Sequence, residues 1–202
     1  MLSVKPYLYT DVIEEIRDTV KQDVVIVMIA AGQTIAVNEA RFGRNIKIVR
    51  AMPNTPCMVL SGVIAYSTGT AVTDEDEEAA RRLLSGCGSV FKVEESRMNA
   101  VSAISGCGPA YMFTALDALS DAGVAMGLPR KTALELAAGT MLGSALMVEQ
   151  TGEHPMALRD AVTSPGGTTI AALNALDECG FRNAWIQAVK RAVRRAEEME
   201  GN

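Results

Sequence analysis

The sequence predicts an α/β domain followed by an all-helical domain, and two observations lead to this prediction. Over residues 1–97, short runs of β-branched and apolar residues alternate with helical stretches, which is typical of a parallel sheet with crossover helices. From about Met98 onward the strand-like runs stop, and apolar residues recur at the three- and four-residue spacing of packed helices. We therefore place the domain boundary between residues 97 and 98.

The strands of the first domain are expected at 24–29, 46–51, 63–67 and 90–93, and its helices at 34–41 and 74–84. The first strand, VVIVMI, is apolar throughout, which indicates burial on both faces of the sheet. The 74–84 helix begins with four acidic residues and ends with Arg81 and Arg82, so its charges oppose the helix dipole at both ends.

The helices of the second domain are expected at 108–126, 129–149, 155–162, 166–178 and 182–199. The second of them carries many small residues, which are Ala133, Ala137, Ala138, Gly139, Gly143, Ser144 and Ala145. Small residues let a neighbouring helix come close, and an apolar helix with little charge requires burial on all sides. We infer a subunit interface on this helix, and hence a homodimer or a higher homo-oligomer.

Composition excludes several classes of protein. The longest apolar run is far below the roughly 18 residues that span a bilayer, and no charged stretch with an apolar core opens the chain, so we expect a cytoplasmic protein without membrane contact. The net charge of −5 argues against nucleic acid as a partner. The cysteines contain no CxxC pair and are expected as free thiols: Cys57, Cys87, Cys107 and Cys179. With His154 as the one histidine, and that in a helix-start turn, we expect no metal site.

The stretch Ser164–Leu173, SPGGTTIAAL, indicates a binding site for a small carboxylate. Ser164 is expected as the N-cap of a helix and Pro165 at its first position. The two glycines that follow allow a ligand to approach the backbone, and the helix N-terminus favours a negative charge. The alternative interpretation is an ordinary capped helix.

Four motifs together resemble one enzyme family. The stretch Ala157–Asp177, ALRDAVTSPGGTTIAALNALD, resembles the signature of pyrroline-5-carboxylate reductase, which catalyses the last step of proline synthesis. The stretch Ala103–Tyr111, AISGCGPAY, resembles the SGSGPAY loop of that family, with Cys107 where a serine is more common. Ala51–Pro56, AMPNTP, and Ser3–Pro6 resemble two further family motifs, and all four occur in the family's order.

The resemblance implies a fold, a reaction and a set of site residues. Residues 1–97 would be the C-terminal half of a Rossmann-like NAD(P)-binding domain, and residues 98–202 a helical domain for dimerisation and substrate binding. The reaction would be reduction of 1-pyrroline-5-carboxylate to L-proline with NADPH or NADH. Thr169 would be catalytic. The substrate would lie against Val162, Thr163, Ser164, Gly166, Gly167, Thr168 and Thr169, and the cofactor against Ser3, Val4, Lys5, Pro6, Ala30, Ala31 and Asn54. Lys5 could equally be a solvent-exposed lysine and Asn54 a turn former.

The sequence contains no GxGxxG turn of the kind that holds a dinucleotide. By resemblance its first residues correspond to the fourth strand of the family's nucleotide domain, so we expect an N-truncated fragment with impaired activity. Two alternatives remain. One is a helical dimerisation module without catalysis. The other is a different 6-phosphogluconate-dehydrogenase-like oxidoreductase, although such enzymes commonly use a lysine, and Lys131 and Lys190 do not lie in a glycine-rich helix start.

Overall fold

The computed structural model describes residues 1–200, and the chain folds into two compact units. One unit comprises Met1–Pro109 together with the chain from Ala188 onward, and the other comprises Ala110–Gln187. The domain boundary that we expected between residues 97 and 98 stays a prediction. Strands are confined to the first unit, so the predicted change from α/β to all-helical architecture is confirmed.

A four-stranded sheet forms the centre of the first unit. Its strands are β1 (Val25–Met28), β2 (Lys47–Met52), β3 (Gly62–Thr68) and β4 (Gly88–Lys92), in the order β1-β2-β3-β4. The β1–β2 and β3–β4 pairs are parallel, as predicted, but β2 and β3 are antiparallel. The expectation of a parallel sheet was wrong at this pair because the connection from Pro53 to Ser61 is shorter than the dozen or so residues that a parallel crossover requires.

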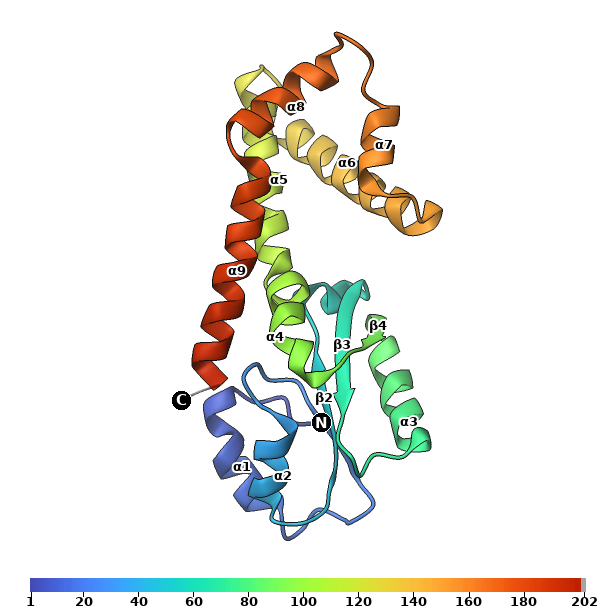
Figure 1. Cartoon of the computed structure of the whole chain (residues 1–202), viewed down its shortest axis with the longest axis vertical. Helices are drawn as coiled ribbons and strands as arrows, with labels where there is room; N and C mark the ends of the chain where they lie inside the picture. The colour runs from blue at the N-terminus through green and yellow to red at the C-terminus, as the bar shows by residue number, and fades with distance from the viewer. Residues whose placement is uncertain (201–202) are drawn as a thin grey trace. The chain divides into compact units, whose positions relative to one another are not determined.

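Helices cover both faces of the sheet (Figure 1). On one face, α1 (Tyr9–Ile16) and α2 (Ile35–Phe42) bury a cluster that includes residues of β1 and β2. On the other face, α3 (Asp74–Ser85) packs on a second cluster. Within β1, Ile26 and Met28 belong to the first cluster and Val27 to the second, which confirms burial of this strand on both faces.

The chain before α1 lies alongside β1. Leu2 forms a parallel bridge with Met28, and its amide donates to the Val27 carbonyl over 2.8 Å. The hydroxyl of Tyr9, which is fully buried, donates to the Leu2 carbonyl over 3.0 Å, and burial raises the pKa of this phenol. The Ser3–Pro6 segment therefore comes directly after a residue that pairs with β1 at the edge of the sheet.

Three short segments lead from β4 to the long helices. After the 3₁₀ turn η3 (Glu95–Arg97) and α4 (Met98–Val101), a π-helical turn η4 (Ser102–Gly106) leads into the long helices. These are α5 (Gly108–Ala125), α6 (Arg130–Thr151), α7 (Pro155–Ala161), α8 (Thr168–Glu178) and α9 (Phe181–Glu200). Their positions agree closely with the predicted ones. His154 caps α7, as expected, and its Nδ1 accepts from the Met156 amide over 3.2 Å.

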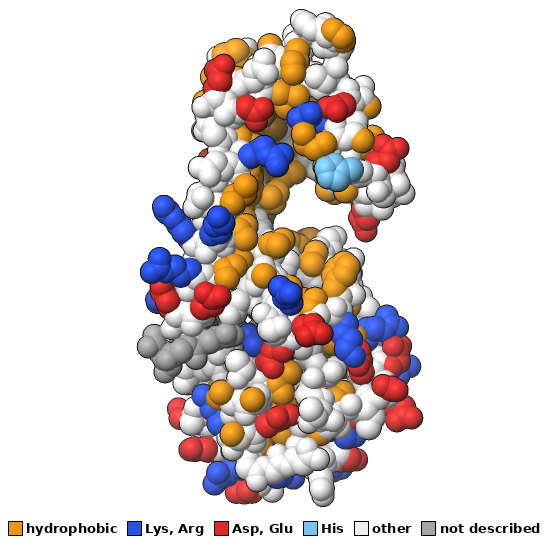
Figure 2. Space-filling model, viewed as in Figure 1, with side chains coloured by type: hydrophobic (Ala, Val, Ile, Leu, Met, Phe, Trp, Pro, Cys, Tyr) orange, Lys and Arg blue, Asp and Glu red, His pale blue; other side chains and the backbone are white. Residues whose placement is uncertain are grey.

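Most of α6 is exposed in the single chain. Ala133 and Ala137 are buried, and an added Cβ on Gly123 of α5 would lie 2.9 Å from the Ala133 Cβ, so the two helices touch there. Large apolar side chains elsewhere on α6 reach the surface, including Leu136 at 56% and Leu142 at 63% exposure. Figure 2 shows exposed apolar side chains on the helical unit and interspersed charges of both signs on the sheet-containing unit. Within residues 1–200, no helix combines the length and apolarity needed to cross a membrane.

Candidate functional site

Three of the segments expected at the cofactor follow neighbouring, parallel-running stretches of chain. Ser3–Pro6 follows the bridge at Leu2, Ala30 and Ala31 follow β1, and Asn54 follows β2. Because the carboxyl ends of parallel strands meet at one edge of a sheet, the three segments come together there. In open α/β sheets this edge is where ligands bind. A hydrogen bond connects the loop after β1 to the Ser3–Pro6 segment, since the side-chain amide of Gln33 donates to the Pro6 carbonyl over 3.3 Å.

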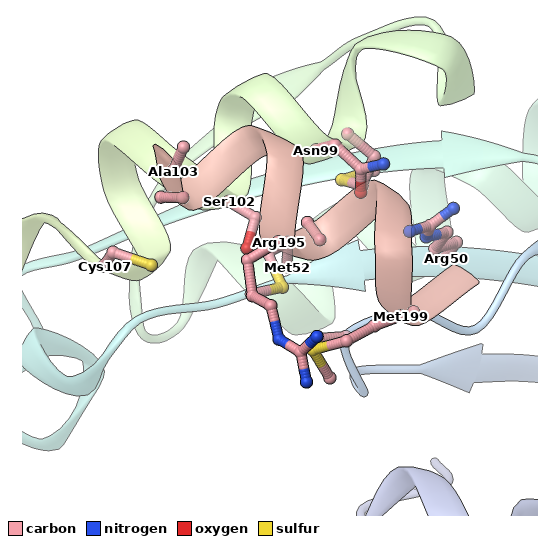
Figure 3. Close-up of a pocket in the computed structure, with 13 residues that line it drawn as sticks. Arg50, Met52, Asn99, Ser102, Ala103, Cys107, Arg195 and Met199 are labelled. Carbon is pink, nitrogen blue, oxygen red and sulfur yellow. The ribbon is translucent and has the colours of Figure 1, made fainter. Parts of the chain in front are cut away.

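A pocket of about 230 Å³ opens at this edge. Ala31 and Gly32 line it from the β1–α2 loop, and Arg50 and Met52 line it from β2. The remaining lining residues are Met98, Asn99, Ser102, Ala103 and Cys107 from the chain after β4, and Ala192, Arg195, Ala196 and Met199 from the end of α9. Figure 3 shows Met52, Ser102, Arg195 and Met199 gathered around the pocket. Small and apolar side chains dominate the lining.

The π-helical turn lies directly against the β2–β3 connection. The Cys107 amide donates to the Ser102 carbonyl over 2.8 Å, one residue further along the chain than in an α-helix. A Cβ added to Gly106 would lie 3.0 Å from the Met52 Cε. The AISGCGPAY and AMPNTP motifs are therefore packed on each other, and a larger residue at this position would have to displace the end of the Met52 side chain.

The side chain of Asn54 is committed to internal hydrogen bonds. Its amide nitrogen donates to the Ser105 carbonyl over 3.0 Å, and its oxygen accepts from the Val63 amide over 2.9 Å. These bonds join the two motifs to β3. Lys5 and Ser3 are exposed, Val4 is half-buried, and Ala30 is buried. A contact of any of these residues with a cofactor stays a prediction. The side chain of Asn54 makes no bond to the turn that follows it, so the turn-forming alternative is not supported by its side-chain contacts.

Sequence reasoning missed an ion pair beside the pocket. The Glu95 carboxylate accepts from the Arg50 guanidinium over 3.0 Å and from the Ile35 amide over 2.8 Å with the same oxygen. The side chain of Arg50 is only 5% exposed. The available signal was a charged residue in the buried strand KIVRAM, because an arginine is almost never fully buried unless it is paired.

The SPGG stretch forms a tight turn before α8. The Gly167 amide donates to the Ser164 carbonyl over 3.1 Å, and Gly166 has a φ of +67°. The N-cap of α8 is Gly167, so the expectation that Ser164 caps the helix and Pro165 occupies its first position was wrong. The reason is that Pro followed by Gly with positive φ favours a type II turn, which a helix cannot accommodate.

The start of α8 keeps polar groups available. Thr168, Thr169 and Ile170 are the first residues of this helix, whose first-turn amides have no partner within an α-helix. Within residues 1–200, no hydrogen bond engages the hydroxyls of Thr168 and Thr169. The hydroxyl of Thr163, in contrast, donates to the Arg159 carbonyl over 2.6 Å, and its backbone amide donates to the Asp160 carbonyl over 3.1 Å, so both of its donors are engaged.

The expected site residues fall into two groups. Those expected at the cofactor lie in the sheet-containing unit, and those expected at the substrate, which span Val162–Thr169, lie in the helical unit. Within each group the structure brings the residues together. Val162, at 66% exposure, and Ser164 lie at the surface of the helical unit.

The strongly shifted pKa values belong to a different part of the first unit. Hydrogen bonds from Lys47 and Thr73 lower the pKa of Asp76, in the first turn of α3, to about 2. Burial, with a hydrogen bond to Glu77, raises the pKa of Tyr66 to about 12. Neither residue lines the pocket. Among the described residues, no three His, Cys, Asp or Glu side chains lie close enough to hold a metal ion.

Comparison with known proteins gives the same family throughout. The family model for pyrroline-5-carboxylate reductase dimerisation matches residues 95–199. A pyrroline-5-carboxylate reductase of Glycine max is 42% identical over 199 residues, which cover 98% of this chain and 72% of that protein. Two solved structures align with a TM-score of 0.92 over 98% of this chain. One is a Plasmodium falciparum pyrroline carboxylate reductase with NADP bound, at 33% identity over 78% of its chain, and the other a Coxiella burnetii pyrroline-5-carboxylate reductase, at 36% over 74%. The chain belongs to the pyrroline-5-carboxylate reductase family.

Proposed function

We propose that this chain reduces 1-pyrroline-5-carboxylate to L-proline with NADPH or NADH as the hydride donor. The observation that supports this most is that three segments meet at one edge of the sheet, namely Ser3–Pro6, Ala30–Ala31 and the β2–β3 connection. A pocket opens beside them, and the chain belongs to this family. When bound, the cofactor supplies the hydride. The residues of the chain bind and orient both reactants.

The β1–α2 loop suits a planar ring and a ribose. Ala30, Ala31 and Gly32 have no side chain larger than a methyl group. A Cβ added to Gly32, whose φ is +72°, would meet only the Met199 carbonyl, at 4.0 Å, so the loop leaves room for a ligand to approach its backbone. The residues proposed to hold the cofactor are Ser3, Val4, Lys5, Pro6, Ala30, Ala31 and Asn54, with Asn54 acting through its backbone and its position.

The start of α8 suits the substrate carboxylate. The first-turn amides that follow Gly167, beginning with that of Thr168, would donate to the carboxylate, and the helix dipole favours the negative charge. The Gly167 amide itself donates to the Ser164 carbonyl and shapes the turn. Gly166 and Ser164 shape the turn, and the backbone of Val162 and Thr163 closes the site. No positively charged side chain is required for this binding.

Thr169 is proposed to interact with the ring nitrogen. Reduction of a cyclic imine adds a hydride to carbon and requires one proton on nitrogen, which the solvent supplies. A hydroxyl that is hydrogen-bonded to that nitrogen can orient the ring for this step. The hydroxyl of Thr169 is not engaged by other described residues, which keeps it available. His154 has a capping role in α7 and takes no part in the proposal.

We propose that the chain works as a homodimer joined through the helical unit, in the cytoplasm. The exposed apolar residues of α6 support the dimer, and the matching family model is a dimerisation domain. The four cysteines are free, which suits a reducing compartment.

The test is an assay of the 202-residue chain with 1-pyrroline-5-carboxylate and each cofactor, in which both cofactor oxidation and L-proline are measured. The matched control substrate is 1-pyrroline, which has the same ring without the carboxylate. We expect kcat/KM for 1-pyrroline to be lower by a factor of about 10 or more, since hydrogen bonds to a charged group contribute about 1.5–3 kcal/mol each. Equal kcat/KM for both substrates would contradict binding at the α8 N-terminus, and no L-proline would contradict the proposed reaction.

A further inference from the structure

We infer that Glu95 is a positioning residue for the cofactor: it fixes the Ala30–Gly32 loop by holding the start of α2 against Arg50 of β2. The inference rests on the proposed function, because it assumes that this loop binds a nicotinamide cofactor. Glu95 lies outside the motifs by which the sequence resembles its family, and it does not itself line the pocket.

In the Ala30–Gly32 loop only Ala30 is held by its own packing, since it is buried in the core cluster beside β1. Its three residues carry two methyl groups and a hydrogen as side chains, and Ala31 is exposed. The position of such a loop is set by its ends. One end is β1, whose last residue Met28 pairs with Arg50 in the parallel ladder. The other end is the first turn of α2.

Glu95 determines where that first turn lies. One oxygen of its carboxylate accepts from the amide of Ile35, the first residue of α2, over 2.8 Å. The same oxygen accepts from the Arg50 guanidinium over 3.0 Å. Hydrogen bonds with a charged partner are about twice as strong as neutral ones, and a carboxylate at a helix N-terminus is further stabilised by the dipole. A single side chain thereby links β2 to the element that ends the loop.

Arg50 is also part of the site. Arg50 lines the pocket together with Ala31 and Gly32. Its side chain is almost completely buried, whereas that of Glu95 is 31% exposed. If Glu95 is removed, Arg50 loses a charged partner and α2 loses the acceptor for its first amide. Both changes occur next to the loop, so cofactor binding is the property that should respond.

A second helix of the same unit offers a matched control. Asp76 caps α3 in the same chemical way: its carboxylate accepts from the Thr73 amide and pairs with Lys47 over 2.7 Å. The α3 helix packs on the opposite face of the sheet, and none of its residues line the pocket. The variant Asp76→Asn therefore weakens a charged helix start without disturbing the loop.

The experiment compares Glu95→Ala, Glu95→Gln and Asp76→Asn in the 202-residue chain. The readouts are the Kd for NADPH by fluorescence, the thermal midpoint Tm, and kcat and the two KM values in the reductase assay. We expect Glu95→Ala to raise the Kd and the KM for NADPH at least about tenfold, which corresponds to about 1.4 kcal/mol, with the KM for the imine within about twofold. Glu95→Gln keeps an acceptor oxygen and should recover most of the affinity. Asp76→Asn should leave the Kd within about twofold.

The outcomes separate positioning from stability. If Glu95→Ala lowers Tm but leaves the Kd for NADPH unchanged, Glu95 is only structural and the inference is wrong. If Glu95→Ala does not fold, Glu95→Asp replaces it: the shorter side chain keeps the charge but should not reach Ile35 and Arg50 together, so the Kd for NADPH should again rise about tenfold, and an unchanged Kd would refute the inference. If the wild-type chain binds NADPH but does not reduce the imine, the proposed function is refuted, whereas the inference about Glu95 is still tested by the Kd values of the variants. A wild-type chain that binds no NADPH overturns both.

Discussion

The hydroxyl of Thr169 can be removed with little effect on folding. Thr169 is the second residue of α8, and no described residue accepts from its hydroxyl or donates to it. Valine has almost the same shape and the same branching at Cβ. The change Thr169→Val thus loses no internal hydrogen bond, and we expect the free energy of unfolding to stay within about 0.5 kcal/mol of the wild-type value.

The effect on catalysis should be much larger. If the hydroxyl holds the ring nitrogen of the imine, its loss leaves a polar partner unsatisfied in the transition state, at a cost of about 1–3 kcal/mol. That cost corresponds to a fall in kcat of about 5- to 150-fold, because each 1.36 kcal/mol is a factor of ten. The KM for the imine should change less, since the carboxylate is bound by backbone amides that valine retains.

Thr168→Val is the matched control, because it makes the same change one residue earlier in the same helix turn. The Thr168 amide is proposed to bind the carboxylate, and its hydroxyl has no proposed role, so kcat should remain within about threefold of the wild-type value. The assay is steady-state reduction with L-proline quantified, alongside urea unfolding of each variant. Equal kcat for Thr169→Val and the wild type would assign Thr169 to packing and refute the proposal.

Three further predictions follow from the backbone and the charges. The double change Gly139→Leu and Gly143→Leu should convert the proposed dimer into a folded monomer, as measured by sedimentation velocity. A Cβ at either glycine meets nothing within 4 Å inside the chain, but a leucine would overpack a contact between helices of two subunits. A dimer of unchanged affinity would exclude this interface. In Asp76→Asn, the free energy of unfolding in urea should fall less between pH 4 and pH 2 than in the wild type. The reason is that the Asp76 carboxyl, whose pKa falls from 3.8 to about 2 on folding, stabilises the fold above pH 3.8 and loses this effect as the pH drops to about 2. Identical pH profiles of the two proteins would refute this. Gly88→Ala should cost about 4 kcal/mol or more by urea unfolding, because φ is +148° and the new Cβ would lie 2.0 Å from a carbonyl oxygen of β3; a cost below about 1 kcal/mol would be inconsistent with this strand contact.

The sequence predicted most helices and strands because their signals are local. The α3 helix carries a capping box at Thr73 and Asp76 and the expected charges, and it begins and ends within a residue or so of the predicted bounds. The α1 helix was missed although its apolar residues Tyr9 and Ile13 have helical spacing. The direction of β3 was also predictable in principle, from the short connection that precedes it.

The site was only partly predictable. The motifs identified the segments, but not what the side chains do within them. Asn54 bonds to Ser105, fifty-one residues away, and Glu95 bonds to Ile35 and Arg50, sixty and forty-five residues away. Such pairs leave no local pattern in a single sequence. The turn at Pro165 and Gly166 was misassigned because the same residues fit either a helix start or a type II turn, and only the positive φ of Gly166 decides between them.

These observations indicate a site in which recognition depends more on backbone than on side chains. The proposed ligands of the substrate are amides at the start of α8, and those of the cofactor include a loop of alanine and glycine. At such a site, the sensitive positions are those that set the backbone, namely Gly166 with its positive φ, Gly106 against Met52, and Glu95 at the start of α2. Because binding and orientation then depend on small displacements of the chain, substitutions at these positions should alter affinity and turnover even where the substituted residue never touches a ligand.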